Sequence, residues 1–148
     1  MKKIVVATNK KAYHEYNILE QFEAGIQLKG SEVKSIREGK ASLKESYVLI
    51  RKGEAWLKGS HISSYSHTGY EGHEPVRNRK LLLHKKEIHK INSKLAEKGL
   101  TAIPTRMYIK SGFIKLEFGL AKGKKLYDKR ATKKKRDVER DIKRAMKV

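Results

Sequence analysis

The chain has 148 residues, enough for one domain of ordinary size and an additional arm. It contains no cysteine, which excludes a disulfide framework and a thiolate metal site. Lysine and arginine number 36 against 16 acidic residues, and the resulting net charge of +20 exceeds what solubility requires. This excess favours a polyanionic partner, with nucleic acid preferred over an anionic membrane.

The charge is unevenly distributed along the chain. Residues 1–121 carry 23 basic and 12 acidic residues, whereas residues 122–148 carry 13 and 4. The sequence therefore predicts a body over 1–121 and a basic C-terminal tail over 122–148 that is disordered when alone. The N-terminal run 1–7 is too short for a signal peptide, and no segment reaches the roughly 20 apolar residues that span a bilayer. We therefore expect a cytoplasmic protein.

The stretch from Ile18 to Leu28 alternates between apolar and polar residues, which predicts a half-buried strand. The even positions are apolar except for Glu20, and Leu19 is the exception on the polar side. Gly25 predicts a bend or a bulge in this strand.

Two hairpins are predicted at the turn dipeptides Lys52-Gly53 and Ser111-Gly112. The flanking strands are 47–50 and 55–57 for the first hairpin, and 106–110 and 113–121 for the second. In the last strand, one face is predicted to consist of Ile114, Leu116, Phe118 and Leu120, and the other of Lys115, Glu117 and Gly119.

Two helices are predicted between the strands. Ser31 is the expected cap of a short helix that ends near Glu38, before Gly39. The second helix covers 85–98 and carries an apolar stripe of Ile88, Ile91 and Leu95, with Gly99 as its expected C-cap.

These elements together predict a mainly β fold. We expect an antiparallel β-barrel of the oligonucleotide-binding (OB) type, closed or nearly closed, with two or three flanking short helices and the basic C-terminal tail. Residues 61–79 are expected to form a long polar loop.

Three histidines, His61, His67 and His73, recur every six residues in this loop and are candidates for a functional role. They could bind a metal, contact RNA bases or have no role, and the sequence leaves their role open. The dipeptides His14-Glu15 and His73-Glu74 resemble acid–base pairs, but no nucleophile or carboxylate cluster accompanies them. We expect no enzyme activity, no metal and no cofactor.

A basic cluster at residues 77–86 surrounds three consecutive leucines. The leucines are interpreted as the start of a helix that packs on the core. The cations Arg79, Lys80, Lys85 and Lys86 are interpreted as a phosphate clamp around it.

Glu23 is an unexpected acid on the polar face of a strand in a basic protein. It could pair with Lys115 across the sheet, which would contribute little to stability if exposed. It could instead accept hydrogen bonds from base edges or hold a basic residue in place for RNA. The residues alone do not decide between these alternatives.

The chain resembles the SsrA-binding protein family (small protein B), whose members bind transfer-messenger RNA. The resemblance covers nearly the whole chain, and it is specific because six segments occur in the same order. These segments are 9–16, 22–25, 30–37, 46–48, 79–83 and 121–130. It implies that the body binds the tRNA-like domain of this RNA. It also implies that the tail becomes helical in the empty messenger channel of a stalled ribosome, during trans-translation.

The resemblance also assigns residues. It places the RNA contacts of the body on Glu23, Leu82, His84 and Lys115, which favours a functional role for Glu23. The neighbouring cations Lys34, Arg37, Lys122 and Lys124 join Arg79, Lys80 and Lys85 as further candidates. The decoding-centre residues of the tail would be Tyr127, Asp128, Lys129, Arg130, Ala145 and Met146.

The implied partners are transfer-messenger RNA and the ribosome, with its small-subunit decoding centre and rRNA. Elongation factor Tu and alanyl-tRNA synthetase would be functional associates. Two alternatives stay open, a ribosomal protein of similar fold and a general RNA chaperone. The sequence leaves the stoichiometry on the ribosome and self-association undetermined.

Overall fold

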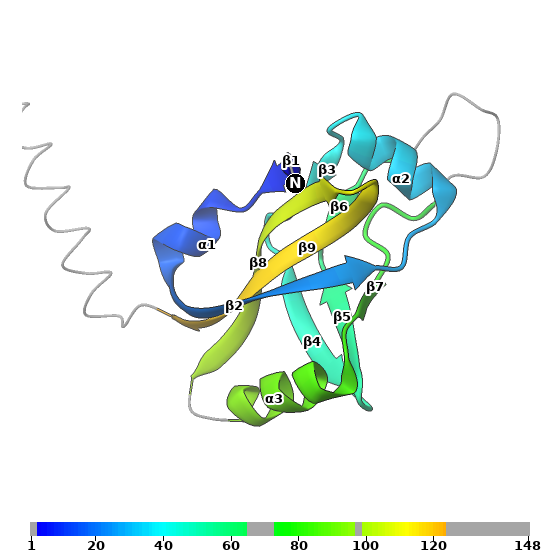
Figure 1. Ribbon diagram of the computed structural model, residues 1–148. Helices are drawn as coiled ribbons and strands as arrows, with labels where there is room; N and C mark the ends of the chain where they lie inside the picture. The colour runs from blue at the N-terminus through cyan, green and yellow to red at the C-terminus, as the bar shows by residue number, and fades with distance from the viewer. Residues whose placement is uncertain (1–2, 65–72, 97–98, 124–148) are drawn as a thin grey trace, which may run out of the picture.

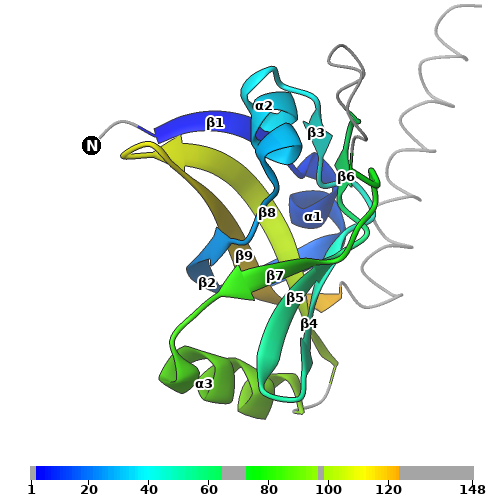
Figure 2. The same cartoon turned by 90° about the vertical axis from the view of Figure 1, so that its right-hand side faces the viewer.

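The computed structural model describes residues 3–64, 73–96 and 99–123. Figures 1 and 2 show the strands wrapped around a common interior, with helices α2 and α3 at opposite ends of the molecule. Within these ranges the elements are β1 (Lys3–Thr8), α1 (Lys10–Glu15), β2 (Tyr16–Ile26), α2 (Gly30–Arg37), β3 (Ala41–Ser42), β4 (Tyr47–Arg51), β5 (Glu54–Lys58), β6 (His61–Ile62), β7 (Arg79–Leu82), α3 (Lys85–Leu95), β8 (Leu100–Lys110) and β9 (Phe113–Gly123).

The main sheet has seven antiparallel strands in the order β1-β8-β4-β5-β7-β2-β9, and β3 pairs separately with β6. A further pairing of β8 with β9 joins the sheet to itself. The strands β8, β4, β5, β7, β2 and β9 therefore form a hydrogen-bonded ring, and β1 extends the sheet along residues 106–110 of β8. The predicted mainly β fold with short flanking helices is confirmed.

Both predicted hairpins are present. Lys52 and Gly53 have φ angles of 52° and 74°, and Ser111 and Gly112 have φ angles of 51° and 79°. Positive φ at both central residues is the geometry of a type I′ turn, whose twist matches that of the flanking strands. The strand before the second turn begins at Leu100 instead of 106, because it continues through Pro104 with a register shift between Pro104 and Arg106.

The core is built by the predicted faces of the long strands. Leu116, Phe118 and Leu120 of β9 are buried, and Ala24 of β2 packs into the same cluster. Leu19 lies where the register shifts between Ile18 and Glu20, which explains its 62% exposure.

Of the bend or bulge predicted at Gly25, the bulge is absent. Gly25 continues the regular pairing of β2 with both β7 and β9. An added Cβ at this position would lie 3.3 Å from the Cβ of Leu82, so the absence of a side chain makes room for that leucine.

The helices begin and end close to the predicted positions. In α2 the cap is Lys29 rather than Ser31, because the Lys29 backbone N–H donates to the Glu32 side chain at 2.8 Å. Gly39 follows α2 with a φ of 76°, as expected for a residue after a helix end. Helix α3 starts at Lys85 as predicted but ends at Leu95.

The three consecutive leucines do not start a helix, contrary to the prediction. Residues 79–82 form strand β7, in which Leu81 is buried and Leu82 is 54% exposed. Period-two alternation explains this difference between adjacent leucines, because successive side chains point to opposite faces of a strand.

Two glycines with left-handed backbone provide a matched stability test. Gly59 has a φ of 78°, and a Cβ there would lie 2.8 Å from the Glu45 carbonyl oxygen, whereas Gly39 has a φ of 76° with open space around it. Both Gly→Ala changes incur the left-handed strain, but only Gly59→Ala adds a backbone clash. We expect Gly59→Ala to lower the free energy of unfolding by about 1–3 kcal/mol more than Gly39→Ala in urea denaturation. Equal losses would contradict the clash.

Candidate nucleic-acid interface

Four strands share an outer face of the ring. Gly25 of β2 pairs with Leu82 of β7 on one side and with Lys115 of β9 on the other, and Lys115 also pairs with Tyr108 of β8. These residues form a row across the four strands. Glu23 lies on the same face of β2 as Gly25, because side chains two apart in a strand share a face.

A groove of about 410 Å³ is lined by three residues of this row, Leu82, Gly25 and Lys115. Leu82 and Phe113, at 54% and 69% exposure, line it together with Lys115 and with Val33 of α2. The groove thus places exposed apolar surface next to a cation. This combination suits a nucleotide, which has an apolar base face and a charged phosphate.

The carboxylate of Glu23 is held by partners from β8. The Tyr108 hydroxyl donates to Glu23 Oε2, and Lys110 Nζ lies 3.5 Å from the same oxygen. Glu23 therefore does not pair with Lys115, which was one of the alternatives that the sequence left open. The Tyr108 hydrogen bond and the charge of Lys110 lower the pKa of Glu23. Glu23 is thus ionised, with both of these contacts made at Oε2.

Tyr108 is in turn fixed by charged neighbours. Its side chain is buried, with Lys3 Nζ 4.6 Å and the Arg106 guanidinium carbon 5.7 Å from its ring centre. Arg106 donates to Glu117 at 2.7 Å, which lowers the pKa of Glu117 and raises that of Arg106. Burial, followed by the bond to Glu23, raises the pKa of Tyr108 and keeps its hydroxyl protonated as a donor.

Sequence reasoning did not find this network behind Glu23. Three of its residues, Arg106, Tyr108 and Lys110, alternate along β8, which places them on the same outer face as Glu23 and Lys115. This alternation along β8 was the sequence signal from which the network could have been predicted.

Several predicted site residues border the groove. Lys115 forms no ion pair with the described part of the chain, so its ammonium group is available to bind a phosphate. Lys34 and Arg37 are exposed on α2, next to the groove residue Val33. His84 and Lys85 are exposed at the start of α3, just after Leu82.

Two other predicted cations lie away from this row. Lys122 is exposed near the end of β9, opposite Asn17 and Leu100, and seven residues of strand, about 23 Å, separate it from Lys115. Lys80 is partly exposed on β7 and lies 3.6 Å from Glu54 of β5.

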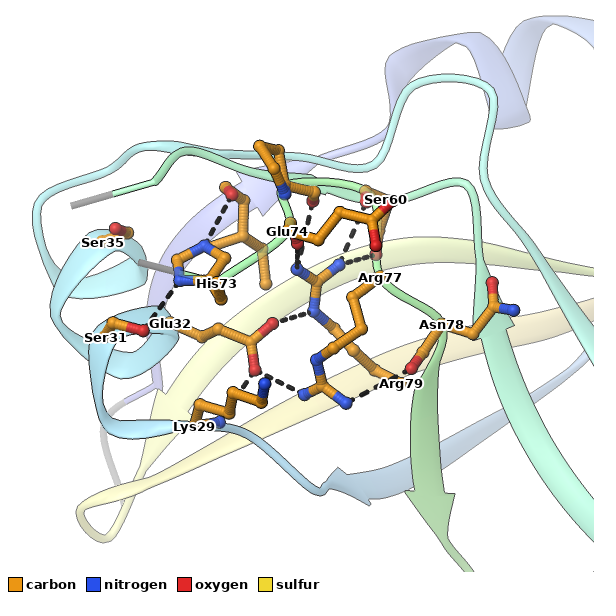
Figure 3. A network of polar contacts seen from close by, with 12 residues as sticks. Lys29, Ser31, Glu32, Ser35, Ser60, His73, Glu74, Arg77, Asn78 and Arg79 are labelled. Atoms are coloured by element: carbon orange, nitrogen blue, oxygen red, sulfur yellow. Dashed lines mark hydrogen bonds and ion pairs between the residues drawn. The ribbon is translucent and has the colours of Figure 1, made fainter. Parts of the chain in front are cut away.

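Arg79 does not contribute to a phosphate clamp, and this prediction is corrected. Its side chain is fully buried, and its Nε donates to Glu32 Oε2 at 2.5 Å, as Figure 3 shows. Its remaining nitrogens donate to Ser60 at 3.1 Å and to the Pro75 carbonyl at 3.1 Å. Arg79 points into the ring because it alternates with the outward Lys80.

Arg79 belongs to a buried polar network around α2 (Figure 3). Glu32 accepts from Arg77 at 2.5 Å as well as from Arg79, and His73 bonds to Ser31 at 2.8 Å and to the Ile62 carbonyl at 2.8 Å. The network joins α2 to β6 and β7. It therefore fixes the position of α2 beside the groove.

The loop histidines do not converge in the part of the chain that is described. His73 is buried as a structural residue, and His61 is exposed on β6. His67 lies outside the described residues. Residues 3–64, 73–96 and 99–123 contain no group of three potential metal ligands.

The tail candidates Lys124, Tyr127, Asp128, Lys129, Arg130, Ala145 and Met146 lie outside the described residues. Among the described helices, none has the length and apolar character needed to cross a bilayer.

The ring of antiparallel strands, the mixed apolar and cationic groove, and the charge of +20 define a protein of the RNA-binding class. A family model described as "SmpB protein" matches residues 6–148. The chain therefore belongs to the SmpB family.

The relatives of this chain match it over nearly its full length. It is 55% identical to the SsrA-binding protein of Geotalea uraniireducens (strain Rf4), over 99% of this chain and 97% of the relative. It is also 55% identical, over the same shares, to the SsrA-binding protein of Sulfurihydrogenibium sp. (strain YO3AOP1). A chain of the solved structure "tmRNA-SmpB: a journey to the center of the bacterial ribosome" aligns with a TM-score of 0.68 and 44% identity, covering 80% of this chain and 84% of that chain.

Proposed function

We propose that this chain binds transfer-messenger RNA and delivers it to stalled ribosomes for trans-translation. The observation that carries the proposal is the outer face on which Leu82 and Lys115 line a groove, with Glu23 two residues from the groove residue Gly25. Relatives with 55% identity are SsrA-binding proteins, and the aligned structure contains tmRNA and SmpB, which supports the same partner here.

The fold suits this role as an oligonucleotide-binding-type barrel. The pairing of β8 with β9 that closes the ring supports this assignment. The body 1–121 binds the tRNA-like domain and the tail 122–148 occupies the empty mRNA channel and decoding centre of the small subunit. The protein acts in the cytoplasm without a cofactor and catalyses no reaction. Elongation factor Tu and alanyl-tRNA synthetase act with it.

Each candidate residue on or beside this outer face has a distinct task in RNA binding. Glu23, ionised and held by Tyr108, accepts hydrogen bonds from base edges. Lys115 binds a phosphate, and Leu82 covers the apolar face of a base or sugar. His84 and Lys85 extend the contact at the start of α3.

The direct test compares binding to transfer-messenger RNA with binding to bulk tRNA in moderate salt, for the full chain and for residues 1–127. We expect tight and selective binding by both proteins, because the tail acts on the ribosome. Equal and weak binding to both RNAs would mean that the +20 charge acts without selectivity, and the proposal would fail. Ribosome association that survives high salt without the RNA would instead favour a ribosomal protein.

Two single substitutions test this outer face. Glu23→Ala and Lys115→Ala should each weaken binding to the tRNA-like domain by about 1–3 kcal/mol. Only Lys115→Ala should also reduce the salt slope of binding, by about one, because it removes a phosphate contact. Fluorescence anisotropy over a salt series measures both effects. The exposed Lys44→Ala is the control, and an unchanged affinity for the Glu23 and Lys115 variants would remove these residues from the site.

A further inference from the structure

The outer face of the β4–β5 hairpin carries Trp56, the single tryptophan of the chain. Ala55 and Leu57 are fully buried, so alternation along β5 turns Trp56 outward, where it is partly exposed. Trp56 is flanked by Leu49 of β4 and by Lys80 of β7, which pair with it on either side. The groove beside Trp56 shares no lining residue with the groove that contains Lys115.

Cations surround the indole. A groove of about 310 Å³ beside it is lined by Arg51, Lys52 and Lys58, with Glu54 as the acid. Within the described ranges these three cations form no ion pair, while Glu54 lies 3.6 Å from Lys80 Nζ. With Lys80 included, four cations and one acid surround the aromatic ring. The resulting positive field favours an anionic ligand over a protein surface of mixed charge.

The ring itself is available for stacking. Among the described residues, no aromatic ring and no cation is stacked on Trp56, and its N–H makes no hydrogen bond. Nor is this N–H among the buried unpaired atoms, so it reaches solvent. A positive groove with an accessible aromatic ring is the combination that binds single-stranded nucleic acid without sequence readout.

We propose that Trp56 is a stacking platform for an unpaired RNA base, and that Arg51, Lys52 and Lys58 bind the phosphates on either side of that base. The inference rests on the proposed function, because it extends the RNA contact beyond the first groove. Strand β7 connects the two surfaces: Lys80 pairs with Trp56, and Leu82, two residues further, lines the first groove on the same outward face.

Tryptophan fluorescence tests the stacking directly, because all of the emission comes from Trp56. The full chain is titrated with a single-stranded oligoadenylate of about ten nucleotides, a length typical of such sites. We expect quenching of the emission that saturates with the binding curve measured by anisotropy of a labelled oligoadenylate. Full binding without a change in emission would overturn the stacking.

Substitutions separate stacking from charge. Trp56→Leu should weaken oligoadenylate binding about tenfold, while Trp56→Phe should keep part of the affinity because its ring still stacks. Arg51→Ala/Lys58→Ala keeps the tryptophan and should weaken binding more than the charge-matched control Lys10→Ala/Lys44→Ala, whose lysines are exposed on other elements. Equal losses in the two double variants, or unchanged binding in Trp56→Leu, would overturn the proposal.

Binding to transfer-messenger RNA distinguishes the two proposals. The protein could bind that RNA selectively while its emission is not quenched and Trp56→Leu does not change oligoadenylate binding. This result would overturn the stacking platform and leave the proposed function intact. Absence of selective binding in the unchanged protein would overturn both. The thermal unfolding midpoint of each variant is measured alongside, and Arg51→Ala/Lys58→Ala carries the test if Trp56→Leu does not fold.

Discussion

Glu32→Ala is expected to lower the free energy of unfolding by about 3–5 kcal/mol, because it leaves a buried guanidinium without its counter-charge. Glu32 and Arg79 are both fully buried, and their contact is 2.5 Å long. The same carboxylate also accepts from Arg77 and from the Lys29 backbone N–H. Its removal therefore takes the acceptor from the buried Arg79 Nε and from the partly buried donors of Arg77 and Lys29 at once.

The matched control is an ion pair on the surface. Lys11 Nζ lies 2.7 Å from Glu45 Oε1, and both side chains are largely exposed. Glu45→Ala should leave the free energy of unfolding nearly unchanged in the same urea titration, because water already solvates both groups. A loss for Glu32→Ala as small as that for Glu45→Ala would show that the buried network contributes no more than a surface pair.

The same network predicts how stability depends on pH. Burial acts to raise the pKa of Glu32, but the bonds from Arg77, Lys29 and Arg79 outweigh it and hold the pKa below its ordinary value of 4.5. The unfolded chain then binds a proton at higher pH than the folded protein does. The contribution of Glu32 is complete above about pH 4.5 and is lost as the pH falls through the folded-state pKa. Urea titrations between pH 7 and pH 3 should show a shallower decline for Glu32→Ala than for the unchanged protein.

The local features of the fold follow from the sequence because short-range chemistry determines them. The two turn dipeptides adopt positive φ by themselves, and the face of β9 with Leu116 and Phe118 follows from alternation alone. Helix α1 was not predicted, because only Ala12 among its six residues is buried and no apolar stripe marks it. Strand β1 was not predicted either, since it lies at an edge of the sheet with Ile4 and Val5 exposed.

The errors at the site come from partners that are distant in the sequence. Arg79 was expected at the surface because isolated cations are rarely buried, yet its counter-ion Glu32 lies 47 positions away. For Glu23 the sequence offered Lys115 as one possible partner, whereas its partner Tyr108 lies on the predicted strand 106–110, whose position beside Glu23 was not known. Single residues could be assigned to the outer face, but their contacts depended on which strands are neighbours.

The largest functional effect is expected in the tail, which belongs to the proposed function and lies outside the described residues. Asp128, Lys129 and Arg130 changed together to alanine should leave affinity for the tRNA-like domain nearly intact and stop peptide tagging. The change removes one net positive charge from a chain of +20, so the general attraction to RNA is almost preserved. Tagging stops because the altered residues are those proposed to occupy the decoding centre.

Peptide tagging on a truncated message in reconstituted translation, measured beside anisotropy with the tRNA-like domain, separates the two roles. The control variant changes Lys133, Lys134 and Asp137 to alanine, which removes the same net charge from the same tail. If this control tags normally while the Asp128/Lys129/Arg130 variant does not, tagging depends on the position of these three residues in the tail and not on its net charge. A large loss of RNA affinity in the latter variant would instead move these three residues into the binding site of the body. Normal tagging by both variants would mean that the tail acts through its overall charge, because a polyanionic channel attracts any sufficiently basic segment.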